Sequence, residues 1–476
     1  MNPRKFKASL FVATLSLLSS LLPQPVGALV EPAEKSELRD AEIIRPLPGA
    51  LDSVPVFNSN CPEVVLGEGV LLSTFKAGVD PSGTLPYEFM GDFDVFFHHI
   101  ADGKKSGHME NLYLGLVARN DGKKSARLEI KSGASYLSQP DAPFIKLKEK
   151  VDNTGGDVYA GPGDRVTSEL LLDRVKDNLK GAIEVPSGKT VLVRSFAIPV
   201  NNLEPPLNGR NGLLHLHSDR PVSLALVSLF ARKTDTDKFV EPQAADFIAI
   251  AEKGELTQPR GLKASVPGEP GPIKYGRVAG IATGSSWKAS EKDAFEIVST
   301  PFTLHYPIST VIGGTFGTGQ IQSAPLVARL ADTAWAAHGN YGILYDLTIP
   351  VKNNIKKTVS CHLRLDSPVK GDVKGRAPQY LSPPSTMVFF RGTVQHRILK
   401  DGHQIAKGVS HLVLHHGEKG PDLNVFDLEP GKTAEVNIRL IYPADSTPLR
   451  SSVWKSNRGR YHFGKTRQQT GDFRSR

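Results

Sequence analysis

Residues 112–130 have the sequence LYLGLVARNDGKKSARLEI, and residues 344–363 repeat its pattern as LYDLTIPVKNNIKKTVSCHL. In each stretch an apolar run ends at an asparagine, Asn120 or Asn353, and a lysine pair follows. Beyond this turn every second residue is apolar: Ala126, Leu128 and Ile130 in the first stretch, and Val359, Cys361 and Leu363 in the second. Alternation with a period of two after a polar turn predicts a β-hairpin with one buried face.

The match continues downstream of both hairpins. Gly188-Lys189-Thr190 opens an alternating strand that ends at Pro199, and Gly431-Lys432-Thr433 opens one that ends at Pro443. Two copies of the same strand order indicate an internal repeat. Because each antiparallel sheet must cover an apolar face, we predict an all-β fold of two tandem antiparallel β-sandwich modules.

Composition and the positions of glycine and proline indicate the boundaries of these modules. The chain has 476 residues with 44 glycines, 35 prolines and two cysteines, which excludes a small disulfide scaffold, a multi-pass membrane protein and a wholly disordered chain. One short helix is predicted over Pro242–Gly254 and a second from Asp164 to about Asp177. We expect five parts: a signal peptide (1–28), a first β-sandwich module (29–241), a short helix with a Pro/Gly-rich linker (242–276), a second module (277–450) and a basic tail (451–476).

The amino terminus has the pattern of an export signal. A basic start precedes the apolar run Leu10–Leu22, and the small residues Val26-Gly27-Ala28 predict cleavage after Ala28. The run is too short to span a bilayer as a mature helix, and the later apolar runs are no longer than one strand. We therefore expect an exported protein of the periplasm, cell envelope or extracellular space, with no transmembrane segment after cleavage.

The positive charge lies at the two ends of the chain. Residues 29–450 hold 48 basic and 48 acidic residues, whereas residues 451–476 hold seven basic residues and one acidic residue. This distribution argues against nucleic-acid binding by the body of the protein. We expect the tail to be disordered in isolation. It is either a solvated end without a partner or a binding segment for anionic envelope polymers or lipid head groups, through Lys455, Arg458, Arg460, Lys465 and Arg467.

Catalytic and cofactor motifs are missing from the sequence. The two Gly-Lys-Thr stretches lack the earlier glycine of a phosphate-binding loop, and the glycine-rich run 313–319 lacks dinucleotide spacing. No serine-hydrolase elbow or zinc-protease motif is present. We therefore predict no cofactor and no recognisable catalytic residue. Carboxylates brought together from distant strands could still cleave glycans.

Histidines and cysteines are the remaining candidate ligands. His215 and His217 share one strand face, and so do His411 and His415, which is compatible with zinc or copper binding. Alternating leucines explain the same pattern as ordinary burial, which we favour. Cys61 and Cys361 could form a disulfide in an oxidising compartment, or Cys361 could remain a buried free thiol in phase with its apolar neighbours.

Several further stretches carry a resemblance to a known family. They are Gly161-Pro162-Gly163-Asp164, the loop His338-Gly339-Asn340-Tyr341-Gly342 with its flanks, and the run from Tyr442 to Pro448. Together they resemble a family of exported cyanobacterial proteins catalogued only as a domain of unknown function. The resemblance covers nearly the whole chain up to about residue 450, and it implies no activity or catalytic residue.

Two functions are compatible with the sequence. The first is a non-enzymatic periplasmic or cell-envelope protein with a structural or binding role. The alternative is an envelope enzyme that acts on glycans or wall polymers through carboxylates placed between the modules. A concave site lined by two carboxylates would favour the enzyme, and an aromatic-lined site would favour binding.

Overall fold

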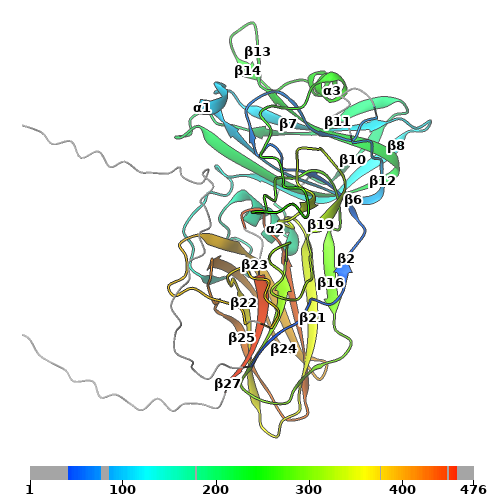
Figure 1. Cartoon of the computed structure of the whole chain (residues 1–476). Helices are drawn as coiled ribbons and strands as arrows, with labels where there is room; N and C mark the ends of the chain where they lie inside the picture. Colours follow the sequence, from blue (N-terminus) through cyan, green and yellow to red (C-terminus); the bar gives the residue numbers. More distant parts are fainter. Residues whose placement is uncertain (1–40, 77–84, 177–178, 376, 447–449, 458–476) are drawn as a thin grey trace, which may run out of the picture. The chain divides into compact units, whose positions relative to one another are not determined.

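Strands dominate the fold, as the sequence predicts. The computed structural model describes residues 41–76, 85–176, 179–375, 377–446 and 450–457 (Figure 1). Helices in this part of the chain are α1 (Gly103–Ser106), α2 (Pro162–Leu171) and α3 (Ala244–Lys253). The prediction of an all-β fold with a few short helices is therefore confirmed.

The largest sheet in the described residues has twelve strands and is organised by one long strand, β12 (Leu207–Phe230). The other strands are β3 (Pro55–Ser59), β4 (Val64–Val65), β5 (Gly69–Ser73), β6 (Phe89–Asp102), β7 (Leu112–Asn120), β8 (Ala126–Leu137), β10 (Gly181–Val185), β11 (Lys189–Ile198), β15 (Ala279–Thr283), β19 (Ala324–Arg329) and β20 (Ala336–Ala337). The first half of β12 pairs with β6 and β8, and its second half pairs with β5 and β7. Apolar side chains from both halves, such as Leu214 and Leu226, share one core.

Two further sheets share a second core. The described part of the first has eight strands: β2 (Ala50–Leu51), β9 (Lys150–Asp152), β16 (Ser286–Ser290), β17 (Phe295–Ile297), β21 (Leu344–Asn353), β23 (Val388–Lys400), β24 (His403–His415) and β26 (Thr433–Ile441). The other has five: β1 (Ala41–Ile44), β18 (Phe302–Ile308), β22 (Val359–Asp366), β25 (Asp422–Leu428) and β27 (Arg450–Asn457). Leu347 of β21 and Leu363 of β22 are both buried in this core. A small hairpin joins β13 (Arg232–Lys233) to β14 (Phe239–Val240).

The internal repeat is present in the strand pairing. β7 pairs with β11 and β8 with β10, and in the same way β21 pairs with β26 and β22 with β25. The Asn120 side chain donates to the carbonyls of Lys124 and Val185, both at 2.8 Å. The Asn353 side chain donates to those of Lys357 and Leu428, also at 2.8 Å. The two asparagines are therefore equivalent turn-closing residues. The strands that each turn joins pair with other strands and not with each other, so the predicted hairpins are wrong.

The strand pairing crosses the module boundaries that the sequence suggested. β1 pairs with β18, β2 with β16 and β9 with β24, so segments of the expected first module join sheets of the second. In the opposite direction, β15 pairs with β3. Contiguous modules at 29–241 and 277–450 do not describe this pairing, because period-two alternation predicts strands but does not identify their partners.

The tail also begins later than expected. Residues 450–457 form β27, labelled in Figure 1, which pairs with β18 on one side and β22 on the other. The prediction that the tail is disordered from residue 451 onward is therefore wrong for the residues of β27. Sequence reasoning missed this strand because the apolar alternation of the preceding strands does not continue into it and because its partner strands are distant in the chain. Residues 458–476 lie outside the described residues, as does the predicted signal peptide.

The two longer helices cover sheet surfaces. α3 matches the helix predicted over Pro242–Gly254, and its buried Phe247 and Ala251 pack with Val117 and Val227. α2 is shorter than predicted and contacts β8, β12, β23 and β26. None of the helices in the described residues is both long and apolar enough to cross a membrane.

Candidate functional site

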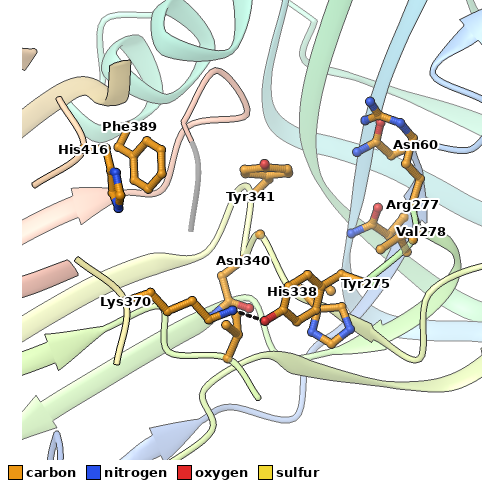
Figure 2. A pocket seen from close by; sticks show the side chains of 15 residues that line it. Asn60, Tyr275, Arg277, Val278, His338, Asn340, Tyr341, Lys370, Phe389 and His416 are labelled. Carbon is orange, nitrogen blue, oxygen red and sulfur yellow. Dashed lines mark hydrogen bonds between the residues drawn. The ribbon is translucent and has the colours of Figure 1, made fainter. Parts of the chain in front are cut away.

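A cavity of about 410 Å³ lies among loops that come from distant parts of the chain. We call it the Tyr341 pocket, and Figure 2 shows it from close by. Its lining is drawn from the end of β3, residues 275–278 where the predicted linker meets the predicted second module, the loop after β20, Lys370, and the ends of β23 and β24. The lining residues used below are Asn58, Asn60, Tyr275, Arg277, His338, Asn340, Tyr341, Lys370, Phe389 and His416.

The His338–Gly342 loop is held in place by Asn340. This residue has a φ of 49°, a left-handed conformation that asparagine tolerates better than most residues. Its side-chain amide donates to the carbonyl of Gln322 and to the hydroxyl of Tyr345, each at 2.9 Å, and its Oδ1 accepts from the backbone of Ala324. A Cβ at Gly339 would lie 2.5 Å from the Tyr341 ring. The loop sequence therefore positions Tyr341 and His338 at the pocket.

Aromatic rings form much of the pocket wall. The rings of Tyr275 and His338 are 4.8 Å apart, and those of Phe389 and His416 are 4.3 Å apart. Tyr341 projects between these two groups in Figure 2. Burial raises the pKa of Tyr341, and it lowers the pKa of His338 to about 4, so that both side chains are neutral near pH 7.

Three polar atoms at the pocket have no hydrogen-bond partner in the described residues: Oδ1 of Asn58, Oδ1 of Asn60 and Nδ1 of His338. Asn58 and Asn60 are only 5% and 6% exposed. An unpaired buried polar atom costs about 1–3 kcal/mol. Such groups are rare in native proteins, and a ligand that supplies the missing partner removes the cost.

The charged groups of the pocket are basic. Arg277 forms an ion pair with Glu63, whereas Lys370 donates a hydrogen bond to the Tyr275 hydroxyl and lies 4.5 Å from the centre of that ring (Figure 2). Burial lowers the pKa of Lys370. No aspartate or glutamate of the described residues lines the pocket. The site can bind polar and anionic groups, but it lacks the carboxylate pair that glycoside cleavage requires.

The four histidines proposed as metal ligands do not come together. His215 and His217 lie in β12, where their Nδ1 atoms are 2.7 Å from carboxylate oxygens of Asp94 and Asp92 on β6. In β24, His411 contacts Asp164 at 2.6 Å and His415 contacts Glu418 at 3.0 Å. No three potential ligands gather in a geometry suited to a metal anywhere in the described residues. Each histidine instead has its own acidic partner, which alternation along one strand could not reveal.

The cysteines are free thiols buried in different cores. Cys61 packs with Phe57 in one core, and Cys361 packs with Leu363 in the other. No disulfide joins them, and the alternative prediction of a buried thiol at Cys361 describes the structure. Burial raises the pKa of Cys361 to about 12. Of the tail residues proposed to bind anionic polymers, Arg458, Arg460, Lys465 and Arg467 lie outside the described residues, and only the backbone of Lys455 is described, within β27.

A second polar cluster connects α2 with β23 and β24. The fully buried Asp164 binds His411, and Ser168 links Asp164 to Thr393. Asp445 accepts a hydrogen bond from the backbone of Asp164 at 2.8 Å. This cluster belongs to none of the cavities described here, and its groups are largely paired with one another. We interpret it as a structural connection rather than a reaction centre.

Sequence reasoning named the His338–Gly342 loop but gave it no role. The lining residues come from segments as far apart as Asn58 and His416, so no local spacing could unite them. One signal was available: Asn58 and Asn60 continue the phase of Val56 in a strand, and polar residues at buried positions are unusual.

The family described as "Protein of unknown function (DUF3370)" matches residues 42–451. The chain belongs to this family. The range matched by DUF3370 contains every residue named here as lining the Tyr341 pocket, and it also contains Asp164 and Asp445.

Other comparisons add no function to the DUF3370 assignment. No curated protein matches the chain. The chain is similar in part to procruciferin, an 11S globulin of Brassica napus, with 8% identity, 83% of this chain and 85% of that chain covered, and a TM-score of 0.11. Oxalate decarboxylase of Bacillus subtilis gives 9% identity, coverages of 78% and 74%, and a TM-score of 0.09. Because these scores are so low, the functional argument depends on the pocket.

Proposed function

We propose that this DUF3370 protein is an exported binding protein of the periplasm or cell envelope, and that the Tyr341 pocket holds a carbohydrate. The observation that carries this proposal is the pair of unpartnered amide oxygens, Asn58 Oδ1 and Asn60 Oδ1, beside a wall of aromatic rings. Export is supported by the basic start, apolar run and small-residue cleavage pattern of residues 1–28.

A carbohydrate supplies both kinds of group that the pocket requires. Sugar hydroxyls can donate to the two amide oxygens, and the Nδ1 atom of His338 can exchange a hydrogen bond with a third hydroxyl. The apolar faces of sugar rings can pack on Tyr341 and on the paired rings of Phe389 and His416. A cavity of about 410 Å³ lies within the range of about 300–1,000 Å³ that is common for small-ligand sites.

The lining favours binding over hydrolysis. A glycosidase needs two carboxyl groups about 5–10 Å apart on either side of the bond that is cleaved. None of the described carboxylates lines the Tyr341 pocket, and the closely spaced pair Asp164 and Asp445 belongs to the separate cluster at α2. This is the aromatic-lined site that the sequence analysis associated with binding.

The test is a binding screen of the purified mature protein. Saturation-transfer NMR would be recorded with neutral and acidic mono- and oligosaccharides, using wild type, N60L and N354L. Asn354 is exposed, so N354L is a matched control outside the pocket. We expect transfer from wild type and N354L to at least one sugar and a loss of at least tenfold in affinity for N60L. If no sugar receives transfer from wild type, or if N60L binds as wild type does, the proposal is wrong.

A further inference from the structure

Lys370 is a partly buried cation without an acidic partner. Within the described residues, its ammonium group donates a hydrogen bond to the Tyr275 hydroxyl, lies over the Tyr275 ring and forms no ion pair. Asp372 is the nearby acid, but its Oδ1 accepts hydrogen bonds from the backbone and hydroxyl of Thr315. The carboxylate is therefore hydrogen-bonded to the 315–319 loop and forms no ion pair with Lys370.

An uncompensated cation is costly at this position. Removing an ammonium group from water is unfavourable unless an opposite charge replaces the lost solvation. The other basic residue of the pocket, Arg277, has such a partner in Glu63. Lys370 thus gives the Tyr341 pocket one positive charge that forms no ion pair with the described protein groups, although Asp372 lies near enough to act on it electrostatically.

The neighbour of Lys370 does not share this charge. His338 is neutral near pH 7, because burial and the lysine itself lower its pKa to about 4. Figure 2 shows Lys370, Tyr275 and His338 grouped at one end of the pocket, away from Asn60. The site therefore has one end with a cation that forms no ion pair, and a separate end where Asn60 lies near Arg277, whose charge is paired with Glu63.

We propose that the ligand of the Tyr341 pocket is an acidic carbohydrate, with its anionic group on Nζ of Lys370 and its hydroxyls on Asn58 and Asn60. This inference rests on the proposed carbohydrate function and adds the charge of the ligand to it. A uronic-acid carboxylate and a sulfate ester offer the same chemistry to an ammonium group, namely a compact anion with several acceptor oxygens. The ring and hydroxyl contacts are common to both.

A matched pair of sugars tests the charge directly. Calorimetric titration of the full mature protein would use tetra-galacturonate, its methyl ester and a sulfated galactose oligomer. The ester keeps the ring and hydroxyls and replaces each carboxylate with a neutral methyl ester. We expect at least one anionic probe to bind wild type at least tenfold more tightly than the ester, and the preference to weaken with added salt because the contact is ionic. The arm that binds more tightly identifies carboxylate or sulfate.

Variants at Lys370 separate charge from folding. K370M should lose the preference for the acid while it still binds the ester, K370R should retain the preference, and K292M, at an exposed lysine outside the pocket, should behave as wild type. Thermal melting checks that each variant is folded. Equal binding of acid and ester by wild type, or an unchanged preference in folded K370M, overturns the inference but leaves carbohydrate binding intact. Absence of binding to every probe overturns both.

Discussion

At the scale of single residues, Asn58 and Asn60 lower the stability of the folded protein. Each buried amide oxygen lacks a partner, so an apolar side chain of similar size should fit the position at lower cost. We predict that N58L raises the free energy of unfolding by about 1 kcal/mol while it abolishes ligand binding. Chemical denaturation and titration of the same preparation measure the two effects.

The matched control is Asn208, an asparagine that is equally buried but satisfied. Its Oδ1 accepts from Ser138 and Gln139, and its Nδ2 donates to the carbonyls of Gln139 and Pro199. N208L should therefore lower stability by about 3 kcal/mol. If N58L destabilises the protein as strongly as N208L does, Asn58 has a structural role that its unpartnered oxygen does not reveal.

Asp445 gives a residue-scale prediction about pH. Asp445 is only partly exposed, and the loss of solvent around its carboxyl group raises its pKa to about 7. The nearby Asp164 adds to this effect. In the unfolded chain an aspartate ionises near pH 4. Between these values the folded state holds a proton that the unfolded state has released, so this residue's contribution to stability falls as pH rises from about 4 to 7. D445N keeps an acceptor for the Asp164 backbone but cannot ionise.

We expect the free energy of unfolding of D445N, relative to that of wild type, to increase by about 2 kcal/mol between pH 5 and pH 8. This value is smaller than the full pKa shift would give, because some solvent reaches the residue. The measurement is thermal or chemical unfolding at both pH values. A constant difference between the two proteins across this range would mean that Asp445 is ionised in the folded state throughout.

At the scale of strands and turns, the two repeated strand–turn–strand segments should respond alike to the same change. Asn120 and Asn353 each bridge a turn carbonyl and a carbonyl of the neighbouring strand, and both are buried. N120A and N353A should each cost about 2–3 kcal/mol, because two carbonyls lose their donor. The double mutant should be nearly additive, since the sites belong to different sheets.

The control for this pair is N354A, one residue along the second turn, whose side chain is exposed and should change stability by less than about 0.5 kcal/mol. Equilibrium denaturation measures all four variants. A large effect at one asparagine and none at the other would show that the local geometry is repeated but its energetic role is not.

How far the sequence predicts this fold depends on whether a feature is local. Alternation after Asn120 and Asn353 identified the strands and the burial of Leu128 and Cys361, because a strand's period is a local property. The predicted hairpins are wrong, because β7 and β8 pair with other strands, and so do β21 and β22. Strand partners are not local: β15 pairs with β3 across more than 200 residues. The same limit hid the pocket, where Lys370 meets Tyr275, and the contacts that join His215 and His411 to carboxylates elsewhere in the chain.

At the scale of the whole molecule, the carboxyl-terminal segment has two parts with different consequences. β27 lies between β18 and β22, so a chain that ends before Arg450 leaves one edge of each of these strands unpaired and separates β1–β18 from β22–β25. Residues 458–476 follow it with six basic residues and one acidic residue. A truncation meant to test tail binding must therefore retain β27, or loss of folding would be mistaken for loss of binding.

We predict that the mature protein ending at Asn457 keeps the unfolding transition of the full chain, whereas one ending at Thr447 loses stability in the five-stranded sheet. If the basic tail binds anionic envelope polymers or lipid head groups, the chain ending at Asn457 should bind them much more weakly at low salt. That difference should shrink at high salt, because exposed charges are screened. Titration with an acidic polysaccharide and with anionic vesicles measures it. Equal binding by both chains at low salt would make the tail a solvated end and leave the Tyr341 pocket as the site to pursue.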